Sequence, residues 1–275
     1  MLTSSQSQVL PRPFLKWAGG KSRLIPQYLP YFPKKFTNYY EPFLGGGAVF
    51  FHLQPKSAVL TDINADLINT YCCVRDRVEE LIAYLKKHDA RHDKDYYYEV
   101  RSYPQGTDIE RAARLIYLNK TCFNGLYREN SKGEFNVPMG KYKNPVICNA
   151  DLLRAVSVVL KSATIEKRHF EDVLNYAKSV EDFVYFDPPY FPINSTSYFT
   201  SYSRDSFNED AQVRLKEVFA QLASQGVKVL LSNSDCEFIR ELYSEFKIKP
   251  ISASRSINSN AKNRGKIREV LISSF

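Results

Sequence analysis

The residues best suited to chemistry are an acid, two prolines and a tyrosine at positions 187–190. They follow residues 183–186, an apolar run of aromatic and β-branched residues that predicts a buried strand. Proline has no backbone N–H, so carbonyl groups in this turn can accept hydrogen bonds from a ligand. With the Asp187 carboxylate and the Tyr190 ring, they match the exocyclic amino group of an aromatic base, which indicates N-methylation. The alternative is a strand that simply ends in a proline-rich turn.

A glycine cluster marks a second candidate site. Residues 38–43 predict a short strand, and Gly45, Gly46 and Gly47 follow it before an apolar helix start. Strand, glycine turn and helix in this order are typical of nucleotide sites in Rossmann-like sheets. The next predicted strand ends at Asp62, which is placed to bind ribose hydroxyls. Asp62 could instead cap the helix that follows it.

Near the N-terminus, the single tryptophan, Trp17, lies beside a glycine turn and Lys21. The sequence Gly-Gly-Lys-Ser at residues 19–22 resembles part of a P-loop. A P-loop needs a glycine six residues before its lysine, and that position is Leu15, so we reject this interpretation. The glycine turn still allows the backbone to approach a ligand closely.

These motifs require a scaffold of alternating strands and helices, which predicts an α/β protein with a Rossmann-like, doubly wound sheet. Between residues 88 and 150 the chain becomes polar, tyrosine-rich and then rich in glycine, asparagine and lysine, which favours an insertion. The expected helices cover residues 65–87, 108–122 and 209–224, and the expected strands cover residues 38–43, 58–61, 163–166, 183–186, 227–232, 247–251 and 267–275.

Composition narrows the function classes. The chain has 275 residues, is 44% hydrophobic and carries a net charge of +8, which suits a polyanionic partner. Its five cysteines lack CxxC spacing and its four histidines are scattered, so we expect no metal site. The chain lacks a run of 18 apolar residues, so no membrane-spanning helix is expected. Its first residues are polar and do not resemble a signal peptide.

Taken in order along the chain, the motifs resemble those of the Dam-type DNA adenine-N6 methyltransferases of the α class. The resemblance extends over nearly the whole length. It includes the segment from Asn124 to Arg128 and residues 133–138, which resemble the target-recognition region of the GATC-reading branch. It implies a catalytic domain formed by residues 1–87 and 151–275, with an inserted, mainly helical target-recognition domain at residues 88–150.

The resemblance also assigns roles to individual residues. The catalytic motif is Asp187, Pro188, Pro189 and Tyr190, and the implied cofactor is S-adenosyl-L-methionine. His169 departs from the family, which often has an acid at that position. The implied cofactor-binding residues are Trp17, Lys21, Phe43, Gly45, Gly47, Asp62, Phe170 and Asp187.

The implied substrate is double-stranded DNA, in which the target adenine is flipped out of the helix. Phe123 would wedge into the gap, with a buried core position as the alternative. Arg128 could make a bidentate contact to guanine or could instead bind a phosphate. The implied DNA-binding residues are Phe123, Asn124, Leu126, Arg128, Pro138, Lys141 and Lys143.

The tail from Lys249 to Arg268 contains six basic residues and no acid, which fits either a DNA-backbone contact or a solvated loop. Three function classes remain: a DNA adenine methyltransferase, a methyltransferase for another amine, and a non-catalytic DNA-binding protein on the same fold. The resemblance favours the first. We expect a cytoplasmic or nucleoid-associated monomer with no membrane and no metal partner.

Overall fold

A computed structural model describes residues 9–130, 132–193, 207–254 and 266–275. The chain divides into two compact units, and each is considered by itself. Unit 1 comprises Met1–Gly20, Gly46–Gln54 and Ala65–Ala163. Unit 2 comprises Lys21–Gly45, Pro55–Asn64 and Thr164–Phe275. This division follows compactness and assigns no function, so the recognition domain at residues 88–150 stays a prediction.

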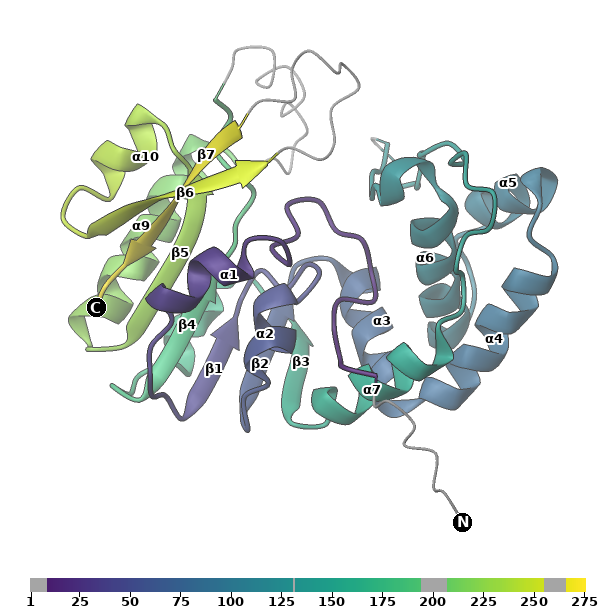
Figure 1. Cartoon of the computed structure of the whole chain (residues 1–275), viewed down its shortest axis with the longest axis horizontal. Helices are drawn as coiled ribbons and strands as arrows, with labels where there is room; N and C mark the ends of the chain where they lie inside the picture. Colours follow the sequence, from purple (N-terminus) through teal and green to yellow (C-terminus); the bar gives the residue numbers. More distant parts are fainter. Residues whose placement is uncertain (1–8, 131, 194–206, 255–265) are drawn as a thin grey trace, which may run out of the picture. The chain divides into compact units, whose positions relative to one another are not determined.

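Among the described residues, the sheet of unit 2 has seven strands. They are β1 (Asn38–Glu41), β2 (Ala58–Asp62), β3 (Ala163–Lys167), β4 (Asp182–Phe186), β5 (Lys228–Ser234), β6 (Lys247–Ser254) and β7 (Lys266–Ser273). Their order across the sheet is β3-β2-β1-β4-β5-β7-β6 (Figure 1). β1 pairs in parallel with β2 and β4, and β4 pairs in parallel with β5. β7 is antiparallel to both β5 and β6, so the mostly parallel Rossmann-like sheet is confirmed.

The strand order reverses between β1 and β4. The chain runs outward from β1 through β2 to β3, and it then returns to β4 and continues outward on the other side through β5. Open α/β sheets bind ligands at such a switch point, outside the carboxyl ends of the strands. The glycine motif follows β1 and the Asp-Pro-Pro-Tyr motif follows β4, so the topology places both at this point.

Both faces of β4 are buried, which explains its unbroken apolar sequence. Val184 and Phe186 pack into a core with α9 (Glu209–Ser224), α10 (Glu237–Leu242) and the 3₁₀ helix η3 (Phe170–Asn175). Phe183 and Tyr185 alternate with them and contact aromatic rings from the segment that contains α1 (Ile25–Tyr28) and the 3₁₀ helix η1 (Leu29–Tyr31). Aromatic side chains therefore cover one face of β4, and mainly aliphatic ones cover the other.

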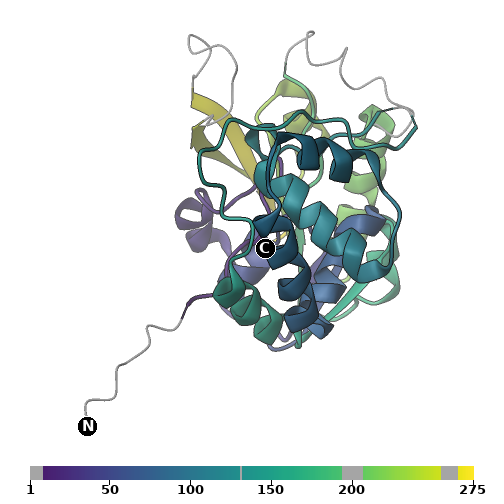
Figure 2. The same cartoon turned by 90° about the vertical axis from the view of Figure 1, so that its right-hand side faces the viewer.

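Unit 1 is helical, and its helices can be followed in Figure 2. They are α2 (Ala48–Leu53), α3 (Ala65–Asp76), α4 (Val78–Ala90), α5 (Lys94–Ser102), α6 (Asp108–Thr121), the 3₁₀ helix η2 (Phe123–Gly125) and α7 (Ala150–Leu160). α6 packs against α3, α4 and α5, so it forms the centre of this unit. Its buried face includes Ala112, Leu115 and Ile116, which follow helical spacing.

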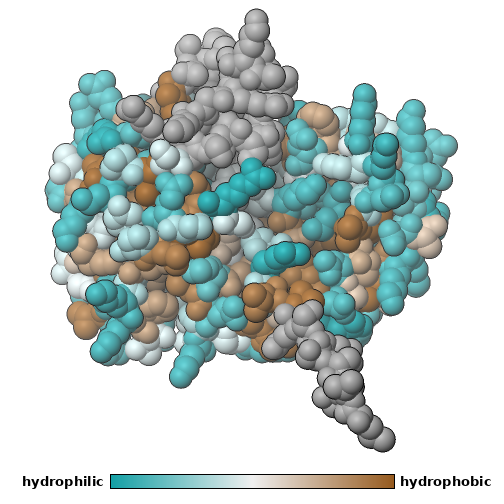
Figure 3. All heavy atoms as spheres, viewed as in Figure 1, coloured by the Kyte–Doolittle hydropathy of each residue, from teal (hydrophilic) through white to brown (hydrophobic). Residues whose placement is uncertain are grey.

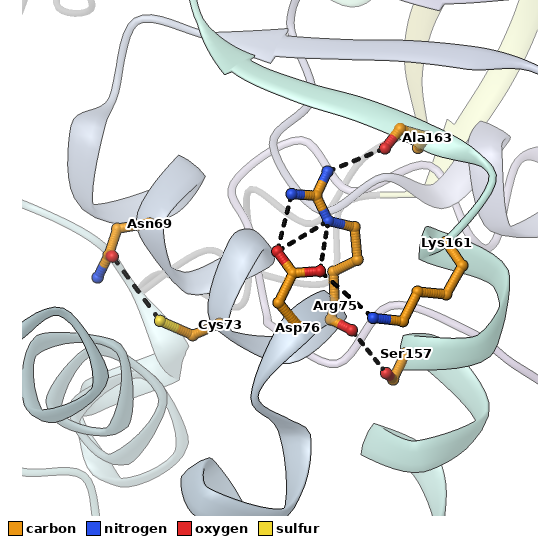
Figure 4. A network of polar contacts seen from close by, with 7 residues as sticks. All are labelled: Asn69, Cys73, Arg75, Asp76, Ser157, Lys161 and Ala163. Atoms are coloured by element: carbon orange, nitrogen blue, oxygen red, sulfur yellow. Dashed lines mark hydrogen bonds and ion pairs between the residues drawn. The ribbon is translucent and has the colours of Figure 1, made fainter.

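The single helix expected over residues 65–87 is wrong, because it breaks into α3 and α4 at Arg77. A polar network lies at the break (Figure 4). The Ser157 hydroxyl of α7 donates to the Arg75 carbonyl at 3.0 Å, and the Arg75 guanidinium donates to the Ala163 carbonyl at 3.0 Å. Asp76 pairs with both Arg75 and Lys161. The end of α3 is therefore fixed by groups that lie about 85 residues later.

In the described part of the chain, four helices were not expected from the sequence: α1, α5, α7 and α10. Two of them begin at a single capping residue, which is a weak signal in a sequence. Asp93 caps α5 by accepting from the Tyr96 N–H at 2.8 Å, and the Asn149 side chain caps α7 in the same way. No described helix is long and apolar enough to cross a membrane. On the face drawn in Figure 3, hydrophilic side chains are spread among hydrophobic ones.

Candidate active site

Asp187 lies directly after β4, where two basic and polar groups hold its carboxylate. The Lys21 ammonium is 2.8 Å from Asp187 Oδ1, and the Lys21 side chain is only 3% exposed. The Ser232 hydroxyl of β5 donates to the same oxygen at 2.9 Å, and Tyr185 Oη lies 3.0 Å from Ser232 Oγ. The carboxylate is thus oriented from two sides while 20% of its side chain stays exposed.

The Tyr190 ring lies beside the same lysine. Lys21 Nζ is 4.5 Å from the ring centroid, a cation–π arrangement. The Tyr190 hydroxyl donates to Glu269 Oε2 of β7 at 2.8 Å, and the Tyr28 hydroxyl donates to the same oxygen at 3.3 Å. Burial raises the pKa of Tyr190 well above its ordinary value, so the phenol keeps its proton and donates.

The backbone of residues 187–191, which we term the β4 turn, is also held by side chains. The Gln212 amide of α9 donates to the Pro189 carbonyl at 3.0 Å. The Phe191 N–H donates to Asn233 Oδ1 at 3.1 Å, and Asn233 Nδ2 donates to Gln212 Oε1 at 2.9 Å. Gln212 and Asn233 are both fully buried. This buried amide pair therefore joins the turn to α9 and β5.

Sequence reasoning missed these supporting residues. The sequence Ser-Asn-Ser at residues 232–234 could have been noticed, because three polar residues at the end of a buried strand need partners. Gln212 and Glu269 give no comparable signal, since each is one polar residue within an ordinary helix or strand pattern.

Asp62 and the glycine turn form a second cluster in unit 2. Asp62 Oδ2 accepts from the Gly45 N–H at 3.1 Å, and Oδ1 accepts from the Asn64 N–H at 2.9 Å. Gly45 has a φ of 44°, a left-handed conformation that glycine adopts without strain. Burial raises the pKa of Asp62, while its backbone hydrogen bonds oppose that rise. Asp62 therefore orients the glycine turn.

The rings of Phe43 and Phe170 stack at 5.4 Å with an interplanar angle of 22°, and Phe207 contacts both edge-on. The resemblance assigns both rings to the cofactor, and they touch each other here. His169 lies 3.1 Å from a Glu171 oxygen, so an acid does stand near this position, two residues later than in the family pattern.

Two predicted cofactor residues lie in unit 1. The Trp17 ring stacks on Tyr127 at 5.2 Å, and Gly47 has a φ of 64° at the N-terminus of α2. A Cβ at Gly46 would be 3.5 Å from Trp17 Cβ, so Gly46 lies close against the tryptophan.

Residues 123–143, which we term the η2 loop, carry the predicted DNA contacts and lie in unit 1. Phe123 is 47% exposed, so it is not a core residue, and Asn124 has a φ of 57°. Buried Asn119 supports the loop: it accepts from the Lys16 N–H at 2.8 Å and donates to the carbonyls of Lys16 and Gly125 at 2.7 and 3.2 Å. A Cβ on Gly125 would be 2.4 Å from a Lys16 carbon, so this close approach requires glycine.

Arg128 is exposed, and its Nε donates to Asn136 Oδ1 at 2.7 Å. Glu129 and Phe135 form an antiparallel bridge. Three further predicted DNA contacts are exposed: Pro138, Lys141 and Lys143. Leu126 is half-buried. In the basic tail, Arg255, Lys262 and Arg264 lie outside the described residues.

The donor set fits a nucleoside that carries a positive charge. Unit 2 offers aromatic rings at Phe43 and Phe170, a backbone-held carboxylate at Asp62 and a second carboxylate at Asp187. Aromatic faces suit adenine, and carboxylates suit ribose hydroxyls or a cation. Among the described residues, no cluster of three or more His, Cys, Asp or Glu side chains could hold a metal ion.

Comparison with known proteins decides the family. A family profile for D12 class N6 adenine-specific DNA methyltransferases matches residues 17–257. The chain belongs to this family. It is 44% identical to the type II methyltransferase M1.LlaDCHI of Lactococcus lactis subsp. cremoris, over 96% of this chain and 95% of that protein. It is 43% identical to the type II methyltransferase M.MjaIII of Methanocaldococcus jannaschii, over 96% and 99% of the two chains.

A third relative bears on the predicted Dam type. The DNA adenine methylase of Escherichia coli K12 is 36% identical, with 94% of each chain covered. The D12 methyltransferase described here is thus an adenine-specific DNA methyltransferase, and S-adenosyl-L-methionine is its methyl donor, as the sequence predicted.

Proposed function

We propose that this D12 methyltransferase transfers a methyl group to N6 of adenine within GATC in duplex DNA, by base flipping and direct in-line transfer. The η2 loop carries the sequence assignment, because it combines a backbone anchored by Asn119 with exposed side chains at Phe123 and Arg128. The resemblance of residues 124–138 to the GATC-reading branch is the reason for proposing GATC as the DNA recognition sequence.

The β4 turn supplies the chemistry. The Asp187 carboxylate and the Pro188 carbonyl accept from the target amino group. The full negative charge of the carboxylate and the partial charge of the carbonyl oxygen favour a pyramidal nitrogen. They also stabilise the positive charge that develops on this nitrogen. Tyr190 stacks on the flipped base, and the buried Gln212–Asn233 pair keeps the turn in place.

S-Adenosyl-L-methionine, when bound, supplies a methyl group on a positively charged sulfur. Asp62 binds its ribose hydroxyls, and Phe170 packs on its adenine. Trp17, Lys21, Phe43, Gly45 and Gly47 complete the cofactor set. Because Lys21 pairs with Asp187 at 2.8 Å, this lysine links the proposed cofactor set to the proposed catalytic motif.

In the DNA, Phe123 fills the gap left by the flipped adenine, and Asn124 pairs with the orphaned partner base. Arg128 reads guanine through O6 and N7 in the major groove. Leu126, Pro138, Lys141 and Lys143 make the remaining contacts of the η2 loop. The enzyme acts as a monomer in the cytoplasm or on the nucleoid, where its substrate is found.

Methylation of an unmodified plasmid by the purified enzyme tests this proposal. Sequencing that reports modified adenines should find methylation at GATC and strong depletion at other adenines. Methylated adenine at a different recurrent sequence would overturn the GATC assignment and leave the chemistry intact. Modified cytosine in place of adenine would contradict the proposed fit of the β4 turn to an adenine amino group.

A further inference from the structure

Glu269 lies on β7 opposite Ser234 of β5, at the edge of the sheet where the β4 turn begins. One of its oxygens, Oε2, accepts from the Tyr190 hydroxyl at 2.8 Å and from the Tyr28 hydroxyl at 3.3 Å. Tyr28 is fully buried, and it ends the short helix α1. Two phenol groups from distant parts of unit 2 therefore converge on one carboxylate.

The same carboxylate shares its electrostatic environment with the catalytic motif. Burial raises the pKa of the Glu269 carboxyl and the Asp187 carboxylate raises it further, whereas the Lys21 ammonium and the two phenol hydrogen bonds oppose this rise. A buried carboxylate costs free energy unless its environment compensates for the lost hydration. A partly buried acid that makes its best contact with Tyr190 is therefore more readily explained by function than by stability.

We propose that Glu269 is a positioning residue for methyl transfer: it holds the Tyr190 hydroxyl and so fixes the plane of the ring that receives the target base. This inference rests on the adenine methyl transfer of the proposed function, but it is independent of GATC. Tyr190 rotates about two side-chain bonds. The Lys21 ammonium over its face and the Glu269 carboxylate at its hydroxyl restrain both rotations.

The test uses the full-length enzyme, labelled S-adenosyl-L-methionine and unmethylated DNA that contains adenines in all sequence contexts. Glu269→Gln keeps the shape but weakens the acceptor. We expect kcat to fall about 10- to 100-fold, because a poorly oriented stacking group misplaces the amino group, while cofactor affinity measured by calorimetry stays near the wild-type value. The matched control is Glu245→Gln, which removes the charge of an exposed glutamate paired with Lys216 in the same unit.

A double-mutant cycle identifies the route of the effect. If Glu269 acts through the phenol, Glu269→Gln should cost little more in a Tyr190→Phe enzyme that already lacks the hydroxyl. Losses that multiply in the double variant would overturn the proposal, because Glu269 would then act on something other than Tyr190.

Thermal unfolding separates positioning from a structural role. Because Glu269→Gln weakens the acceptor of two phenol hydrogen bonds beside the Lys21 ammonium, its melting temperature should fall, but only by roughly 2–4 °C. A lowered melting temperature with unchanged kcat would show that Glu269 is merely structural. A wild-type enzyme that transfers no methyl group to any adenine would instead reject the proposed function, whereas methylation outside GATC alone leaves the role of Glu269 testable.

Discussion

The β4 turn and the η2 loop are both irregular segments, but they are held in different ways. In the β4 turn, side chains as well as backbone are anchored: Asp187 by Lys21 and Ser232, and Tyr190 by Glu269. In the η2 loop, Asn119 holds the backbone while Phe123 extends into solvent. Preorganised groups suit chemistry at one fixed atom, and exposed groups suit a large partner that arrives from solution.

The supporting residues differ in the same sense. The β4 turn draws its anchors from α9, β5 and β7, so the rigid sheet transmits its geometry to the reacting groups. The η2 loop is held only through its backbone in these contacts: by the buried Asn119 amide near the end of α6, by the chain near Lys16, and by the Tyr97 hydroxyl of α5, which donates to the Val137 carbonyl at 2.9 Å. We therefore expect substitutions in the β4 turn to affect turnover, and substitutions in the η2 loop to affect binding and sequence choice.

The largest effect is expected at Asp187. Asp187→Asn keeps the size and one acceptor oxygen but removes the negative charge that would stabilise the amino nitrogen as it becomes positive. We expect kcat to fall by on the order of 10³-fold or more while circular dichroism stays that of the folded enzyme. Turnover within a few-fold of the wild-type value would contradict the proposed role of the β4 turn in catalysis, because the Asp187 charge would then be dispensable.

A smaller effect is expected at Asn119. In Asn119→Ala, the Lys16 N–H and the carbonyls of Lys16 and Gly125 lose their side-chain partner. We expect about 2–3 kcal/mol lower stability in urea titrations and weaker DNA binding, with kcat at saturating DNA nearly unchanged. Asn69→Ala is the matched control, since this amide lies on α3 of the same unit and makes only local contacts among the described residues: it donates to the Asp108 carbonyl at 2.8 Å and accepts from the Cys73 thiol at 3.7 Å. A loss of kcat with normal DNA affinity would contradict the division of roles.

Much of the sheet could be predicted from the sequence. Buried parallel strands favour apolar runs, and residues 183–186 and 229–231 show them. The glycine turn could be predicted because its left-handed backbone at Gly45 and Gly47 needs glycine. These signals are local, which is why they could be read without a structure.

The anchors of the β4 turn could not be predicted in this way. Glu269 follows Asp187 by 82 residues, and a glutamate in a strand near the C-terminus has the same local pattern whether it faces solvent or a tyrosine. The break between α3 and α4 depends likewise on Ser157 and Ala163, which are distant in the chain. Hydrophobic periodicity carries no information about such pairings.

The smallest expected effect concerns Arg128, and it tests the η2 loop at a single base. Its guanidinium is exposed and already held by Asn136 at 2.7 Å, so the side chain is partly oriented before DNA arrives. A bidentate contact to guanine should be worth about 1–3 kcal/mol of discrimination, so Arg128→Ala should relax the preference at one guanine and leave kcat on GATC nearly unchanged. Methylation rates on substrates that vary one base at a time measure this directly.

Lys141→Ala is the control, because losing a phosphate contact weakens binding on all sequences and lowers the salt dependence. Equal weakening on every sequence in Arg128→Ala would identify this arginine as a phosphate contact too, and base reading in the η2 loop would then have to come from its other side chains.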